Sequence, residues 1–243
     1  MELKIAKKMV LAALAVSGAA FAQTKAPEPD YTLSYNVGVV SDYRYRGISQ
    51  TARKPALQGG ADFAHKSGFY LGTWASSIKW IKDAGGSADA EVDIYGGYKF
   101  GVGPVGLDVG VLTYNYPDHQ LAVSPNTQEG YIAGTFGPAT LKYSHAFSNL
   151  FGFSDSKNSY YVDLSAAFDM GSGWSVVPHV GYQKVKNNSA ADYTDYSVTL
   201  NKDFGNGLSA SAALVDTDTD AYVAPNGKNL GRSGVVLGVK YSF

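Results

Sequence analysis

The chain has 243 residues, no cysteine and a formal net charge of −1 at pH 7. This charge is too small to indicate nucleic acid or an anionic membrane surface as a partner. The average side chain is slightly polar, which excludes a bundle of membrane-spanning helices. The 18 tyrosines nevertheless favour a membrane location, because a tyrosine ring at a membrane interface can lie at headgroup depth with its hydroxyl in water.

The N-terminal residues have the pattern of an export signal. Three lysines precede a short apolar run over residues 9–16, and Ala20-Phe21-Ala22 is a small-x-small cleavage site. The sequence therefore predicts a secretory signal peptide over residues 1–22, removed after Ala22, and one domain over residues 23–243.

Segments of alternating apolar and polar residues follow along the rest of the chain. Alternation places the two sets of side chains on opposite faces of a strand. The expected strands cover approximately residues 31–46, 55–64, 69–78, 91–100, 105–111, 127–136, 139–148, 160–169, 174–183, 195–201, 208–215 and 235–243. We expect a local bulge at Pro178, since proline cannot donate a hydrogen bond within a sheet.

The connections between these strands alternate between tight turns and longer polar loops. A soluble β-sandwich would also show alternating residues, but it gives no reason for turn and loop lengths to alternate. The pattern predicts an all-β fold, an antiparallel transmembrane up-and-down β-barrel of about 12 strands. An even number of strands places both termini on one side, which is the periplasm for a barrel in the outer membrane of a Gram-negative bacterium. We expect the barrel assembly machinery to recognise the C-terminal Phe243.

Several motifs resemble one bacterial family. The run from Ser41 to Thr51, followed by Pro55 to Gly60, resembles the N-terminal signature of the TorF-type putative porins. Residues 68–76 and 91–98 resemble the same family. This resemblance implies an outer-membrane barrel and leaves its solute unnamed.

Charged residues gather where the first strand approaches the expected outer mouth. Asp42, Arg44 and Arg46 alternate with two tyrosines, Tyr43 and Tyr45. The polar face of such a strand lines the lumen, so we expect the charges inside the barrel and the tyrosines outside.

Glu91 and Asp93 lie near the same mouth in the expected barrel. Opposed charges there would form a constriction that selects ions or solutes. The alternative is that arginine and carboxylate pairs brace a narrow lumen. Deeper in the barrel we expect inward side chains at Asp108, Lys142, Asp163, His179 and Gln183. Acidic groups outnumber basic ones on these faces, which favours a weak preference for cations.

Other chemistry finds little support in the sequence. Asp216, Asp218 and Asp220 have the spacing that begins a calcium-binding loop, but Ala221 and Gly227 stand where that loop needs glycine and an acid. We therefore expect no metal and no cofactor.

An enzyme is also disfavoured. Ser144 and His145 are adjacent, so they point to opposite faces, and no serine lies at same-face spacing from His145 or His179 in the manner of a lipid hydrolase.

The favoured function is a porin-like channel through which small hydrophilic solutes or ions diffuse passively. The alternative is a closed barrel with a structural or surface-binding role, and an outer-membrane lipid hydrolase is less favoured. The expected partners are outer-membrane lipids and small solutes, with no nucleic acid, and we expect a monomer.

Overall fold

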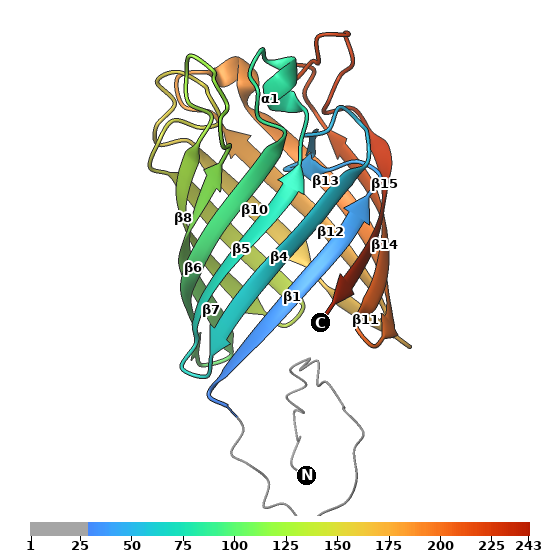
Figure 1. The fold of residues 1–243 in the computed structure, drawn as a ribbon. Helices are drawn as coiled ribbons and strands as arrows, with labels where there is room; N and C mark the ends of the chain where they lie inside the picture. Colours follow the sequence, from blue (N-terminus) through green and yellow to red (C-terminus); the bar gives the residue numbers. More distant parts are fainter. Residues whose placement is uncertain (1–28) are drawn as a thin grey trace, which may run out of the picture.

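The computed structural model describes residues 29–243, so the predicted signal peptide lies outside the described residues. The described chain forms a closed barrel of 12 antiparallel strands (Figure 1). In chain order these strands are β1 (Tyr31–Val40), β4 (Ala56–His65), β5 (Phe69–Ser77), β6 (Ala90–Val102), β7 (Val105–Asn115), β8 (Thr127–Phe136), β9 (Ala139–Ala146), β10 (Tyr160–Ala166) continued by β11 (Phe168–Gly171), β12 (Trp174–Lys184), β13 (Tyr193–Gly205), β14 (Leu208–Thr217) and β15 (Gly234–Ser242). Pairing of β1 with β15 closes the ring. The predicted fold class is confirmed.

The two ends of the barrel differ, as the alternating connection lengths predicted. The start of β1 and the C-terminus lie at one end together with the short turns, and we call this the turn end (Figure 1). The longer connections lie at the other end, called the loop end. They contain a short hairpin, β2 (Arg44–Tyr45) and β3 (Ile48–Ser49), the helix α1 (Trp80–Asp83) and the 3-10 turn η1 (Ser189–Ala191). No helix among residues 29–243 is long and apolar enough to cross a membrane.

The outer surface of the barrel is apolar. On β15, Val235, Leu237 and Val239 are more than half exposed and alternate with inward-facing residues. Aromatic side chains gather on the outside near the turn end: Tyr31, Phe63, Phe69, Phe100, Phe136, Phe168, Phe204, Tyr241 and Phe243. An apolar band with aromatic residues at its border is the surface that a barrel presents to lipid.

The predicted bulge at Pro178 is wrong. Pro178 pairs in register with Val198 of β13, and the register with the other neighbour is the same on both sides of the proline. The neighbouring strand is interrupted instead, because Ala167 separates the end of β10 at Ala166 from the start of β11 at Phe168, and Ala166 is the residue that faces the proline. Proline lacks an N–H and cannot donate an inter-strand hydrogen bond, so regular pairing is interrupted in the neighbouring strand and Pro178 itself stays in register.

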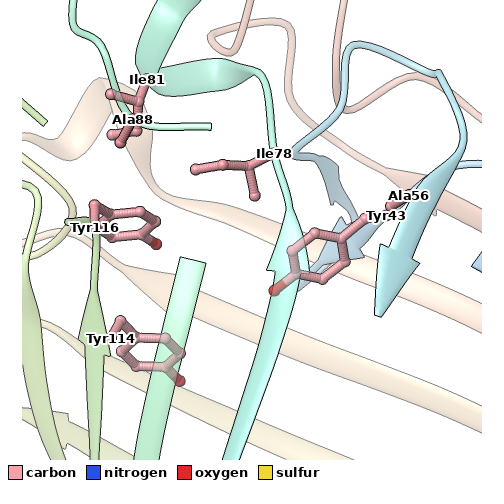
Figure 2. Close-up of a cluster of buried hydrophobic side chains, with 7 residues drawn as sticks. All are labelled: Tyr43, Ala56, Ile78, Ile81, Ala88, Tyr114 and Tyr116. Atoms are coloured by element: carbon pink, nitrogen blue, oxygen red, sulfur yellow. The ribbon is translucent and has the colours of Figure 1, made fainter. Parts of the chain in front are cut away.

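The first strand is shorter than predicted. β1 ends at Val40, and residues 41–55, which we call the inserted segment, turn into the barrel. Tyr43 is therefore buried inside, not exposed to lipid as expected. It belongs to a buried cluster at the loop end with Ala56, Ile78, Ile81, Ala88, Tyr114 and Tyr116 (Figure 2). The interior thus has a small packed core, which anchors the base of the inserted segment.

Candidate functional site

The inserted segment forms a tight hairpin. Tyr45 pairs with Ile48, and the two residues between them, Arg46 and Gly47, have φ values of 46° and 80°. Two successive positive φ values define the type I′ turn that joins two strands most tightly. Gly47 is also required by space, because a Cβ there would collide with the side chains of Thr217 and Asp195. The tip of the hairpin therefore touches the wall formed by β13 and β14.

Asp42 holds the hairpin together from within. Its carboxylate accepts hydrogen bonds from the Ser49 hydroxyl (2.6 Å) and the Thr51 hydroxyl (3.2 Å). Arg44 donates its Nε to the same carboxylate at 2.8 Å. Arg44 also donates to the carbonyl oxygens of Gly47 and Arg232. Asp42 and Arg44 are thus a pair that stabilises the segment. Among the described residues, neither side chain forms a hydrogen bond or ion pair with Glu91 or Asp93, as the sequence suggested it would.

Arg46 reaches from the hairpin tip to the opposite wall. Its Nη1 and Nη2 donate to the two carboxylate oxygens of Glu129 on β8, at 3.0 and 2.6 Å, and Nη1 also donates to Gln183 on β12 at 2.7 Å. The guanidinium lies 4.3 Å from the ring centre of Tyr161 on β10. In the order of strands around the barrel, these three strands lie far from β1. The contact therefore spans the lumen.

The charge of Arg46 survives this burial. Burial is the largest single influence and by itself would lower the pKa of the guanidinium, but the Glu129 carboxylate together with Tyr45 and Tyr114 outweighs burial and raises the pKa above its ordinary value. A bidentate arginine–carboxylate pair has fixed geometry as well as attraction. The pair with Glu129 therefore latches the hairpin tip to the wall of the lumen.

The Glu91 carboxylate accepts hydrogen bonds from two tyrosine hydroxyls. Tyr43 of the inserted segment donates to Oε1 at 2.6 Å, and Tyr116 donates to Oε2 at 2.7 Å. Figure 2 shows these two rings within the buried cluster. Because Glu91 is 2% exposed, its charge depends on these hydrogen bonds. Glu91 anchors the base of the inserted segment as Glu129 anchors its tip.

We expect the Tyr43→Phe substitution to lower the free energy of unfolding by about 2 kcal/mol, because a hydrogen bond to a buried carboxylate is lost. Denaturant unfolding of the folded barrel in lipid vesicles would measure the change. Tyr35→Phe is the matched control, since Tyr35 is exposed on the outside and its hydroxyl has no hydrogen-bond partner among the described residues. Equal stability of both variants would contradict the role given to Glu91.

The remaining predicted lumen residues lie on the inside but form separate groups. Asp108 accepts a hydrogen bond from the Tyr70 hydroxyl at 2.6 Å, and Tyr70 in turn contacts the hydroxyl of Tyr131. The Lys142 ammonium lies 4.1 Å from the centre of the Tyr131 ring. Asp93 is 7% exposed, and its Oδ1 has no hydrogen-bond partner among the described residues.

His179 lies between two carboxylates. Its Nε2 is 2.7 Å from Oδ2 of Asp163, and its Nδ1 is 3.6 Å from Oδ1 of Asp195. The Tyr161 hydroxyl donates to Asp195 at 2.7 Å. This group adjoins Arg46, because the Tyr161 ring contacts the guanidinium.

The hairpin divides the lumen into two cavities of different character. On the loop-end side a cavity of about 230 Å³ is lined mostly by aromatic and apolar side chains, including Tyr45, Trp80, Phe151 and Tyr222. On the turn-end side a cavity of about 460 Å³ is lined by charged and hydroxyl side chains. A third cavity, of about 320 Å³ and with Asn36, Asn201 and Ser211 on its wall, lies nearer the turn end. The polar part of the lumen thus begins directly below the hairpin.

Enzyme and metal chemistry gain no support from the geometry. His145 is half-buried and contacts Tyr143 and Asn158. Within residues 29–243, the one serine hydroxyl hydrogen-bonded to a histidine is that of Ser67, which contacts His65 in an exposed turn. The described residues contain no group of three or more His, Cys, Asp or Glu side chains placed to hold a metal ion.

Sequence reasoning missed the partner of Arg46. Glu129 lies on the inward face of β8, the same face as Tyr131 and Ala133, so its direction follows from the alternation in the sequence. Its contact with Arg46 was not, because the two residues are 83 positions apart.

Two solved structures with a similar barrel fold are described as porins. The structure described as "KdgM porin" matches with a TM-score of 0.56 at 10% sequence identity, covering 87% of this chain and 98% of that chain. The "NanC porin" structure matches with a TM-score of 0.55 at 11% identity, covering 87% and 99%. These likenesses show the fold.

Sequence comparison identifies the family. Among curated proteins, none matches the sequence. A family model described as "Bacterial protein of unknown function (Gcw_chp)" matches residues 24–243, and the chain therefore belongs to this bacterial family.

Proposed function

We propose that the protein is an outer-membrane channel through which small hydrophilic solutes and ions diffuse, with its narrowest point at the inserted segment. In this proposal the turn end faces the periplasm and the loop end faces the exterior, as in other barrels of this type. The resemblance of residues 41–60 to the TorF-type putative porins supports the same function.

The observation that carries the proposal is the polar lumen below the hairpin. A barrel built only for structure could fill its interior with apolar side chains. Here the wall of β13, β14 and β15 presents small side chains to the interior, and most of them are hydroxyl-bearing: Ser197, Thr199, Ser209, Ser211 and Gly238. Small polar side chains leave space for water and offer hydrogen bonds to solutes. The two polar cavities on this wall support a path through which water and solutes pass.

We further propose a weak preference for cations. Inward carboxylates outnumber inward basic groups in the described barrel. Asp42, Asp62, Glu91, Asp93, Asp108, Glu129, Asp163, Asp195 and Asp203 stand against Arg44, Arg46, Lys99, Lys142 and Lys240. One matching structure is described as "KdgM porin in complex with disordered oligogalacturonate". The excess of carboxylates here argues against a polyanionic sugar as the solute of this chain.

Single-channel recording in a planar bilayer tests the proposal. We expect the refolded residues 23–243 to give discrete current steps in KCl, with a reversal potential that indicates a mild cation preference. Folding is checked by the heat-dependent mobility shift of the barrel on a gel. Absence of current from folded, inserted protein would overturn the channel proposal and favour a closed barrel whose loops bind a partner. Selectivity for anions would overturn the proposed cation preference.

A further inference from the structure

The cavity below the hairpin has two charged side chains on its wall without a charged partner. Seven arginine, lysine, aspartate and histidine side chains line this cavity. Five of them are accounted for above: two arginines of the inserted segment are paired with carboxylates, and His179 lies between two aspartates. The remaining two are Asp93 on β6 and Lys142 on β9.

The buried carboxylate of Asp93 lacks a hydrogen-bond donor among the described residues at one of its oxygens. Its side chain is more than nine-tenths buried, yet Oδ1 accepts no hydrogen bond from any described residue. Glu91, two residues away on the same face, is already occupied by two tyrosine hydroxyls. A buried carboxylate without donors is costly, so this position favours a ligand that carries a positive charge and N–H groups.

The ammonium group of Lys142 has no carboxylate partner among the described residues. It lies over the Tyr131 ring, and no carboxylate oxygen in the described chain lies within 4.0 Å of it. Asp163 is its direct neighbour in the sheet but is engaged by His179. The ammonium can therefore donate hydrogen bonds to an anionic group of a solute.

The two side chains come from different parts of the cavity wall, since β7 and β8 separate their strands. A simple cation would satisfy one of them and a simple anion the other. We infer that this cavity binds small zwitterions, in which an ammonium and a carboxylate are joined by a short chain. The ammonium would contact Asp93 and the carboxylate would contact Lys142. This inference rests on the proposed channel and names its solute class.

Four probes of equal chain length separate the two contacts. 4-Aminobutanoate carries both charges, 4-amino-1-butanol carries the positive one, 4-hydroxybutanoate carries the negative one and 1,4-butanediol carries none. Each is added to the refolded barrel during single-channel recording in KCl, and its apparent Kd is taken from the frequency of current interruptions. Calorimetric titration of the folded barrel in detergent measures binding without relying on current.

We expect 4-aminobutanoate to bind most tightly. Asp93→Asn and Lys142→Met should each weaken it by about tenfold, as for loss of one hydrogen bond to a charged group. Asp93→Asn should also weaken binding of 4-amino-1-butanol but not of 4-hydroxybutanoate. Lys142→Met should weaken binding of 4-hydroxybutanoate but not of 4-amino-1-butanol. Lys157→Met, in an exposed loop, is the matched control and should change neither.

The outcomes distinguish this inference from the function on which it rests. Current steps with equal binding of all four probes, or variants that keep the preference for 4-aminobutanoate, would overturn the zwitterion site and leave the channel standing. Absence of current from folded wild-type barrel would overturn the channel, and the solute class with it. A gel mobility shift like that of wild type shows that each variant is folded.

Discussion

Replacing residues 41–55 by an Asn-Gly turn is expected to raise single-channel conductance several-fold. Val40 and Ala56 lie directly opposite each other in the β1–β4 pair, so a two-residue type I′ turn can connect them without disturbing the register. The replacement removes the hairpin that spans the lumen and joins the two cavities it separates. Conductance in KCl, measured on refolded protein, gives the result.

A matched variant separates occlusion from specific contacts. A Gly-Ser segment of the same length keeps the chain in place but loses Arg46 and the hydrogen bonds of Asp42. We expect its conductance to lie between wild type and the turn variant, with larger current fluctuations. If removal of residues 41–55 left the conductance unchanged, ions would pass by another route and the inserted segment would not be the constriction.

Arg46→Ala is expected to have the second largest effect. The substitution leaves the buried Glu129 carboxylate without its bidentate partner and detaches the hairpin tip from the opposite wall. Breaking one side of such a pair leaves a charge that must recruit water. We expect larger conductance and a reversal potential shifted toward cations, both read from bilayer recordings in a KCl gradient.

The control for this prediction is Arg44→Ala. Arg44 pairs with Asp42 inside the hairpin and makes no contact with the opposite wall, so its loss should change conductance less. The double variant Arg46→Ala/Glu129→Ala should restore selectivity toward wild type, because the unpaired carboxylate is gone. Equal effects of the two arginine substitutions would show that the contact with Glu129 is not the latch.

The barrel could be predicted from the sequence because the pattern that defines it, alternation of apolar and polar residues, is visible within each strand alone. Every spanning strand alternates, and the apolar set on one strand faces lipid whatever the neighbouring strands contain. Strand ends agree closely for β8, expected and found over residues 127–136. The connections alternate in length as expected, and this fixed the even number of strands.

The constriction was only partly predicted. Alternation of Asp42, Arg44 and Arg46 with two tyrosines continues the pattern of β1, so the sequence favoured one strand of 16 residues. A spanning strand needs about 9–11 residues, and the excess length was a signal that the chain turns. Arg46-Gly47 was a second signal, since glycine in a two-residue turn permits the type I′ geometry.

The partners of these residues were beyond sequence reasoning. Whether Arg46 reaches Glu129 depends on the diameter of the ring and on the direction in which the hairpin folds, and both are set by the whole barrel. The unpartnered Asp93 shows the same limit. Its inward direction follows from alternation, but its missing donor becomes visible only when every neighbour is placed.

The closing seam of the ring has a consequence for how the molecule assembles and fails. β1 pairs with β15 over residues 36–40, and further backbone hydrogen bonds join Tyr35 to Phe243 and Ser41 to Leu237. These two strands lie some 200 residues apart in the chain, whereas β1 pairs with its other neighbour, β4, along its full length. Closing so long a loop costs entropy that few pairs offset, so we expect this seam to form last during folding. Its amide hydrogens should exchange with solvent sooner than those of the β6–β7 pair, and mechanical or thermal opening should begin there.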